Sequence, residues 1–310
     1  MTIDIKAAFN SDPPPLDFLL PGGPLAGTVG ALVSAGSTGK SFWGLQAAAA
    51  IASRAVPGGD LLDLGVQPDP APADLRDAFV HGDLRHQSGR VVMFAAEDPP
   101  PILITRMQAI GRHLTPEARE EVQRRFILED VMGRGLRMTD PAHRERIIAY
   151  CIDARLVIFD TLNRFHDLEE SDNGQMSQLI SLFENVAYET GAAVLYLHHI
   201  SKATSFGEQG DHQHAGRGAS ALTDNARWVG SLMKMTPKEA EGYGIADDQR
   251  HGYVRFSNPK NNYGAPILDR WYRRGEGGVL LPVTLSASGG GREPQKNGQK
   301  KGKARESATY

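Results

Sequence analysis

The chain contains a single cysteine, Cys151, among its 310 residues. One thiol cannot form an internal disulfide, and it cannot supply a zinc site built from several cysteines, so both of these stabilising devices are excluded. A chain of this length with 40% hydrophobic residues can instead bury a large core. We therefore expect Cys151 to be a small buried apolar group.

Long apolar runs and a basic leader are also missing. No run of about 18 apolar residues occurs. The opening MTIDIKAAFNSD has neither a positively charged start nor an apolar segment. These absences predict a cytoplasmic protein that has no membrane partner.

Positive charge is not in excess, since 34 Lys and Arg stand against 37 Asp and Glu and the net charge is −3. A protein coated with basic residues is therefore excluded, and any contact with nucleic acid has to be local. One local candidate is the segment GGGREPQKNGQKKGKARESATY at residues 289–310. It has no apolar periodicity and is predicted to be disordered, either contacting DNA nonspecifically or only keeping the protein in solution.

The clearest motif is a loop of small residues in the segment ALVSAGSTGKSFWGLQ. The apolar, β-branched residues before it predict a strand, and the residues after it favour a helix. A strand, a glycine loop and a helix in this order form a phosphate cradle, because backbone N–H groups point at the phosphate oxygens. The predicted nucleotide-binding residues of this loop are Ser34, Gly36, Ser37, Thr38, Gly39, Lys40 and Ser41.

Two side chains of the loop have specific roles in such a cradle. Lys40 is expected to reach the β and γ phosphates and Ser41 to ligate Mg²⁺, which predicts a nucleoside triphosphate as the ligand. The loop departs from the pattern G-x-x-x-x-G-K-[ST] at Ser34, where a small residue is sufficient.

Strand and helix signals alternate along the chain, which predicts an α/β fold with a twisted, mostly parallel sheet flanked by helices. The predicted strands are residues 28–33, 90–95, 155–159, 193–197, 228–233 and 253–256. Helices are predicted from position 41 onward, over residues 102–114, after position 116, around residues 176–188 and after Thr236. At the last of these, Glu239 completes a capping box. We divide the chain into a Pro-rich arm (1–27), packed on its own core or on a neighbouring subunit, an ATPase domain (28–286) and the basic tail (287–310).

Three predicted strands end in polar residues. The segment VVMFAAEDP ends in Glu97 and Asp98, LVIFDTL in Asp160, and AVLYLHHISK in His198 and His199. In a parallel sheet these ends share one edge, where ligands bind. Asp160 is then predicted to hold Mg²⁺, Glu97 to orient a water as general base, and one of the two histidines to contact the γ-phosphate.

A carboxylate base at this position favours a RecA-type ATPase, and the chain has no N-K-x-D motif of Ras-type GTPases. Six segments in order resemble the RepA replicative helicases of IncQ-type plasmids, ring helicases with a RecA-like core similar to DnaB. They are ALVSAGSTGKS, FAAEDPP, LVIFDTLNRFH, LYLHHISK, GRGASALTDNARW and NNYGAPILDRW. The resemblance covers about residues 13–282.

The resemblance implies a homohexameric helicase that uses ATP and Mg²⁺ and moves 5′ to 3′ on single-stranded DNA in plasmid replication, with a replication initiator or primase as a further partner. It implies the same site roles as above, with His199, or else His198, sensing the γ-phosphate. Two other functions stay open. One is a RecA-like, DNA-stimulated ATPase that does not unwind DNA, such as a recombination mediator or phage-type ATPase. The other is a P-loop signalling or assembly ATPase that has no nucleic-acid partner.

The family's trans-acting position holds Asn262 in this chain, and no basic residue next to the other motifs is left to stabilise charge on the transferring phosphoryl group. An arginine finger is therefore expected from elsewhere. Arg227, which directly precedes a predicted strand, is the first candidate, and Arg217 and Lys260 are the next.

Two further sets of contacts are predicted from residue type. Tyr263 and Arg106 are expected to sandwich the adenine by stacking and cation–π contact. Lys202 and Arg217 lie in a long Gly-rich loop after the histidine strand and are the candidates for contacts to DNA phosphates. The other loop facing the same edge is acidic beyond Arg164 and is predicted to be a poor DNA surface.

Overall fold

The computed structural model describes residues 2–13, 15–20, 22–53, 62, 89–200, 219–264 and 268–286. The strands are β1 (Val29–Ser34), β2 (Arg90–Ala95), β3 (Phe126–Asp130), β4 (Ala154–Asp160), β5 (Ala193–His199), β6 (Trp228–Lys234), β7 (Tyr253–Asn261), β8 (Arg270–Arg274) and β9 (Leu280–Val283). The α-helices are α1 (Ile5–Asn10), α2 (Lys40–Ala52), α4 (Pro100–Gly111), α5 (Pro116–Arg125), α6 (Pro141–Tyr150), α7 (Asn173–Thr190), α8 (Ala219–Asn225) and α9 (Pro237–Tyr243).

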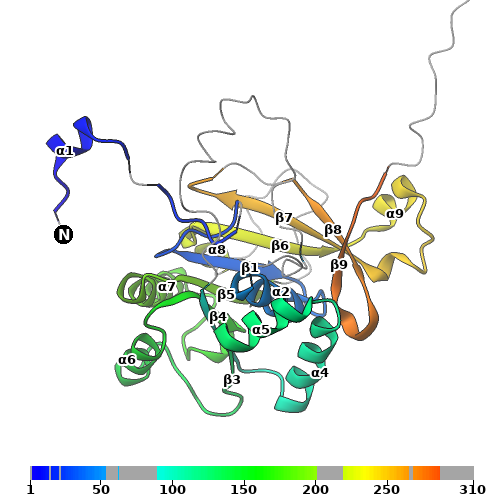
Figure 1. The fold of residues 1–310 in the computed structure, drawn as a ribbon, viewed down its shortest axis with the longest axis horizontal. Helices are drawn as coiled ribbons and strands as arrows, with labels where there is room; N and C mark the ends of the chain where they lie inside the picture. The colour runs from blue at the N-terminus through cyan, green and yellow to red at the C-terminus, as the bar shows by residue number, and fades with distance from the viewer. Residues whose placement is uncertain are drawn as a thin grey trace, which may run out of the picture.

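The strands form one sheet in the order β3-β2-β4-β5-β1-β6-β7-β8-β9 (Figure 1). The pairs from β3 to β6 are parallel, and β7, β8 and β9 extend the sheet in antiparallel pairs. The phosphate-loop strand β1 and the Asp160 strand β4 are separated by β5. The predicted fold class, α/β with a mostly parallel sheet flanked by helices, is confirmed.

Helices cover both faces of the sheet because successive strand residues alternate between two apolar cores. One face packs on α2, α4 and α5, where Trp43 stacks on Phe256 at 5.2 Å between ring centroids. The other face packs on α6, α7 and α8, where Phe159 meets Phe165 and Phe183 edge to face. Cys151 is buried in this second core, as predicted, and burial raises the pKa of its thiol to about 12.

All six predicted strands form, and β7 runs beyond its predicted end to Asn261. Strands β3, β8 and β9 were not predicted, since FILED and RWYRR carry little apolar alternation and LLPV contains proline. The capping box of Thr236 and Glu239 is present at the start of α9. Among the described helices, none has the length and apolar character needed to cross a membrane.

The segment before β1 contacts the chain's own core. Leu19 and Leu20 are buried among core residues, Asp17 accepts a hydrogen bond from Arg155 at 2.7 Å, and the Trp228 indole N–H donates to the Gly22 carbonyl at 2.9 Å. Helix α1 lies apart from the sheet, and its residues are exposed (Figure 1). The arm was predicted to pack either on its own core or on a neighbouring subunit, and these contacts are with its own core.

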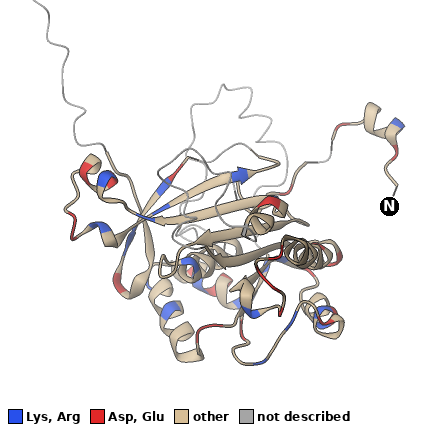
Figure 2. Cartoon of the chain, turned by 180° about the vertical axis from the view of Figure 1, so that it is seen from behind, with Lys and Arg blue, Asp and Glu red and all other residues tan. Residues whose placement is uncertain are grey.

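Charged residues of both signs are interspersed over the described elements (Figure 2). This distribution fits the net charge of −3 and the expectation that contacts to a polyanion are local.

We predict opposite stability changes for two glycine substitutions. A Cβ at Gly230 in β6 would lie 2.6 Å from the Trp228 ring and 2.9 Å from the Phe256 ring, so Gly230→Ala should destabilise the fold by about 1 to 3 kcal/mol. A Cβ at Gly242 in α9 meets no atom within 4 Å, so Gly242→Ala should stabilise it by up to about 1 kcal/mol. Urea unfolding measures both changes, and a Gly230→Ala midpoint equal to that of the unmodified protein would contradict this packing.

Candidate active site

The phosphate loop connects Ser34, the last residue of β1, to Lys40, the first residue of α2. Gly39 precedes the helix with φ of 110°, a conformation that only glycine adopts without strain. A Cβ at Gly36 would meet no atom of the described chain within 4 Å, so the space in front of this residue is open to a ligand. The loop therefore has the geometry of the predicted cradle, with the helix N-terminus facing the open space.

Lys40 is buried at the base of the cradle, with 4% of its surface exposed. Its Nζ lies 3.2 Å from Ser34 Oγ and 2.9 Å from His199 Nδ1. Burial lowers the pKa of Lys40 to about 8, although the nearby carboxylates of Asp160 and Glu97 oppose this shift. Ser34, where the motif departs from the usual glycine, contributes a hydroxyl that accepts a hydrogen bond from Lys40.

Asp160 ends β4 with only 2% of its surface exposed. Burial raises its pKa to about 6, and a hydrogen bond from Ser41 acts in the opposite direction. Its Oδ1 atom is buried and makes no hydrogen bond within the described residues. An unpaired carboxylate oxygen beside a serine hydroxyl is a donor set that suits Mg²⁺, so Ser41 and Asp160 fit the metal role predicted for them.

Glu97 follows β2 and faces three partners. Its Oε1 lies 2.9 Å from Thr161 Oγ1 and 3.6 Å from Arg164 Nε, and its Oε2 lies 3.7 Å from His199 Nε2. His199, Thr161 and Arg164 together lower the pKa of Glu97 to about 2, against the opposing effect of burial. The carboxylate is therefore ionised at neutral pH and can accept a hydrogen bond from a water.

The two histidines of β5 lie on opposite faces of the sheet. His199 bridges Lys40 and Glu97 through its two ring nitrogens. His198 is buried, and burial, with the nearby charge of Lys40, lowers its pKa to about 4, so its ring is neutral at pH 7. The structure thus places His199 in the candidate site, and His198 shares the other face with Tyr196.

Arg106 and Tyr263, the predicted adenine sandwich, are not brought together within one chain. Arg106 donates to Asp98 at 3.1 Å and lies over the Phe42 ring at 5.3 Å, close to the cradle. Tyr263 follows β7, whose last residue, Asn261, pairs with the first residue of β6. That end of β6 lies at the sheet edge opposite the cradle. The prediction that these two residues sandwich one adenine is therefore wrong within a single chain.

Arg227 lies at the same opposite edge, immediately before β6, and its side chain is exposed. Its N–H donates to Val29 O at 2.8 Å, and Asn262 N–H donates to Arg227 O at 3.1 Å. Lys260 is next to it and donates from Nζ to Thr223 O at 3.3 Å. The DNA-contact candidates Lys202 and Arg217 lie outside the described residues.

Two arginines and a threonine near the cradle were missed by the sequence analysis, which assigned no basic residue beside the motifs to stabilise charge on the transferring phosphoryl group. Arg274, at the end of β8, donates to the carbonyls of Ser37, at 3.2 Å, and Thr38. Arg164 and Thr161 follow Asp160 closely in sequence and meet Glu97. The proximity of Arg164 to Asp160 in sequence was an available signal, whereas Arg274 is brought in only by the pairing of β8.

We predict that nucleotide binding takes up a proton at alkaline pH. Phosphates favour the charged form of Lys40, so the bound pKa lies above the free value of about 8. Affinity should be highest below pH 8 and decrease as the pH rises through this value. Calorimetry of Mg²⁺–ADP binding at pH 9, in two buffers of different ionisation enthalpy, should show nearly one proton taken up, and Lys40→Gln should show none. Equal heats in the two buffers for the unmodified protein would contradict the prediction.

Two comparisons relate the chain to known proteins. A family model described as an AAA domain matches residues 2–205. The chain is also similar to the crystal structure of the RadB recombinase, with 15% identity and a TM-score of 0.46 over 84% of this chain and 93% of that chain. The family match spans more than half of the chain and includes the phosphate loop, Glu97, Asp160 and His199. The chain therefore belongs to the AAA domain family and carries its ATP-binding site.

Proposed function

We propose that the protein is an ATP-dependent, ring-forming replicative DNA helicase that moves 5′ to 3′ on single-stranded DNA in plasmid replication. The observation that carries the ATPase part is the bridge made by His199 between Lys40 of the cradle and Glu97, at 2.9 and 3.7 Å. The helicase part is supported by six ordered segments that resemble the RepA helicases of IncQ-type plasmids.

The site residues divide the work of hydrolysis among them. The loop N–H groups and Lys40 bind the phosphates of ATP, and Ser41 and Asp160 hold Mg²⁺, which when bound neutralises charge on the phosphates. Glu97 orients a water toward the γ-phosphate and accepts its proton. Phosphate binding draws Lys40 away from His199. Because His199 contacts both Lys40 and Glu97, it is the residue that transmits loss of the γ-phosphate to Glu97.

A ring arrangement is supported by the position of Arg227. This residue lies at the sheet edge opposite its own cradle, so within one chain it cannot contact the bound phosphates. Its carbonyl is hydrogen-bonded to Asn262, the residue at the position where the resembling helicases carry a trans-acting cation. In the proposed ring, Arg227 of one subunit completes the ATP site of the next.

The alternative, a DNA-stimulated ATPase without unwinding activity, uses the same site. It shares the cradle, the base and the metal-binding residues with the helicase, and it differs only in that it does not unwind a DNA duplex. Unwinding therefore has to be measured separately from ATP hydrolysis.

We predict that single-stranded DNA stimulates ATP hydrolysis and that the protein displaces a strand from forked DNA with a 5′ tail. Hydrolysis should be measured with and without an oligonucleotide, unwinding on 5′- and 3′-tailed forks, and the mass of the oligomer by light scattering with ATP. Stimulation without displacement would favour the alternative function. Absence of any stimulation would favour an ATPase without a nucleic-acid partner.

Two substitutions provide the matched controls for this measurement. Glu97→Gln should still bind ATP but hydrolyse it at least about a hundredfold more slowly, because it removes the general base. Asp98→Asn alters the neighbouring carboxylate, which pairs with Arg106, and should hydrolyse ATP much faster than Glu97→Gln does. If Asp98→Asn shows the larger loss, the base is Asp98.

We predict that two inactive variants restore hydrolysis to each other when mixed. Lys40→Ala lacks a functional cradle but keeps Arg227, and Arg227→Ala has the reverse defect. Where an Arg227→Ala cradle lies next to a Lys40→Ala subunit, a complete site forms. Because a finger supplied in trans contributes about 10³ to 10⁵ in turnover, the recovery should be well above background.

Subunit exchange has to be shown independently, for example by energy transfer between labelled copies. Exchange without recovered hydrolysis would mean that Arg227 does not act between subunits. Lys260 and Arg217 are then the next residues to test by the same mixing experiment.

A further inference from the structure

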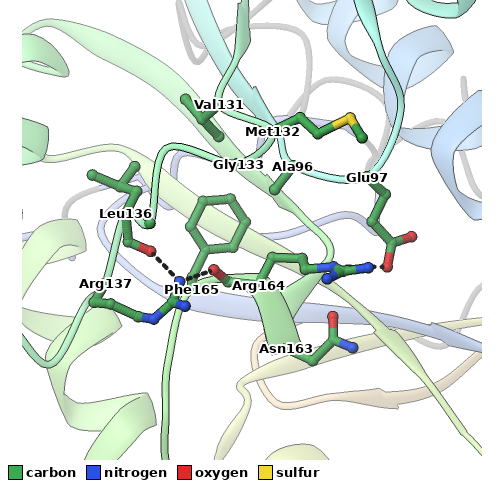
Figure 3. A pocket seen from close by; sticks show the side chains of 11 residues that line it. Ala96, Glu97, Val131, Met132, Gly133, Leu136, Arg137, Asn163, Arg164 and Phe165 are labelled. Carbon is green, nitrogen blue, oxygen red and sulfur yellow. Dashed lines mark hydrogen bonds and ion pairs between the residues drawn. The ribbon is translucent and has the colours of Figure 1, made fainter.

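A pocket of about 400 Å³ lies beside Glu97 (Figure 3). Its walls come from the end of β2, from the segment between β3 and α6, and from the turn η1 (Leu162–Arg164) after β4. This volume is within the range of small-ligand sites. None of the phosphate-loop residues is among the described residues that line it.

Two guanidinium groups line the pocket and come from segments distant in sequence. Arg137 donates from Nη1 to Arg164 O at 2.8 Å and to Leu136 O at 3.3 Å, which fixes its position in the wall. Arg164 extends toward Glu97, with Nε 3.6 Å from Oε1 (Figure 3). Two cations therefore share a pocket with one carboxylate, an arrangement that attracts an anion.

The ion pair between Arg164 and Glu97 is loose. A separation of 3.6 Å exceeds a normal hydrogen bond, and 58% of the Arg164 side chain is exposed. Exposed pairs of this kind contribute little free energy, whereas a phosphate accepts short, bidentate hydrogen bonds from arginine. A phosphate entering the pocket can therefore take Arg164 away from Glu97.

A ligand can approach the backbone of the pocket wall closely. Gly133 and Gly135 have φ of 71° and 63°, and a Cβ at either would meet no atom within 4 Å. Asn163 adds an amide at the rim, and its Oδ1 lies 2.7 Å from Thr161 Oγ1. The hydroxyl of Thr161 has one proton, so it donates either to Asn163 or to Glu97, but not to both at once.

We propose that this pocket binds a phosphodiester group of single-stranded nucleic acid, and that Arg164 is shared between that phosphate and Glu97. The proposal rests on the function proposed above and names its DNA-sensing site. When the phosphate recruits Arg164, Glu97 loses its nearest guanidinium and is free to orient the attacking water. Occupancy of the pocket by DNA is thereby coupled to ATP hydrolysis.

The loop after β4 was expected to be a poor DNA surface because it is acidic beyond Arg164. That expectation considered the residues of this loop alone. In the structure, Arg137 from the segment before α6 supplies a second cation beside Arg164. The acidic residues beyond Arg164 do not line the pocket.

The test measures binding of a fluorescent oligo(dT) to the full chain in the presence of a non-hydrolysable ATP analogue, over a range of salt concentrations. Arg164→Gln and Arg137→Gln should each weaken binding by about tenfold. Each should also reduce the slope of log K against log salt by about 0.7, the value for one phosphate contact on a single strand. The stimulation of ATPase by DNA, expressed as the ratio of rates with and without oligonucleotide, should fall toward one.

Arg146→Gln is the matched control, since Arg146 is exposed on neighbouring α6 and lies outside the pocket. It should bind DNA and respond to it as the unmodified protein does. An abasic oligomer of the same length should also respond to the pocket substitutions, because the pocket is proposed to read phosphate rather than base.

The outcomes separate this inference from the proposed function. If the unmodified protein neither binds the oligonucleotide nor responds to it, the proposed function is overturned and the inference with it. If it does both, and the two pocket variants match Arg146→Gln, the inference alone is overturned. Should Arg137→Gln fail to fold, as judged by urea unfolding, Arg164→Gln decides, because its exposed side chain can be replaced without disturbing the core.

Discussion

The parallel pairing of four central strands is the constraint on which the candidate site depends. Ser34 of β1 is paired with His199 of β5, and Asp160 of β4 is paired with Leu197 of β5 and Ala95 of β2. This register brings the ends of all four strands to one edge, where the phosphate loop, Asp160, Glu97 and His199 lie together. A shift of one residue in any strand would exchange its two faces and would, for example, replace His199 with His198.

Burial then sets the chemistry of this edge. Lys40 is enclosed by the core and lies near two carboxylates, so its charge is poorly solvated without a phosphate. Asp160 is equally enclosed and has an oxygen without a hydrogen-bond partner among the described residues. Glu97 is more open and is held by Thr161, Arg164 and His199. The site is thus arranged for ligands that bring both negative charge and a cation, as Mg²⁺–ATP does.

The two edges of the sheet have different roles in this arrangement. The cradle edge carries the groups that are proposed to contact phosphate, and the pocket of Arg137 and Arg164 adjoins it through Glu97. The opposite edge carries Arg227, next to Asn262. A residue at that edge has no access to its own cradle, so a catalytic contribution from it requires a second subunit. Within one chain the fold therefore keeps Arg227 apart from the cradle, and only the proposed ring would bring the two together.

Local sequence by itself determined the phosphate loop, the six predicted strands and the polar residues that end them, because a cradle and a strand end are formed by consecutive residues. Only the tertiary structure decided that His199 rather than His198 meets Lys40, and that Tyr263 lies away from Arg106. It alone also placed Arg274 on the loop and Arg137 beside Arg164. These contacts join residues far apart in the chain, and they depend on strand register and on the antiparallel additions β7 to β9, for which short motifs carry no signal.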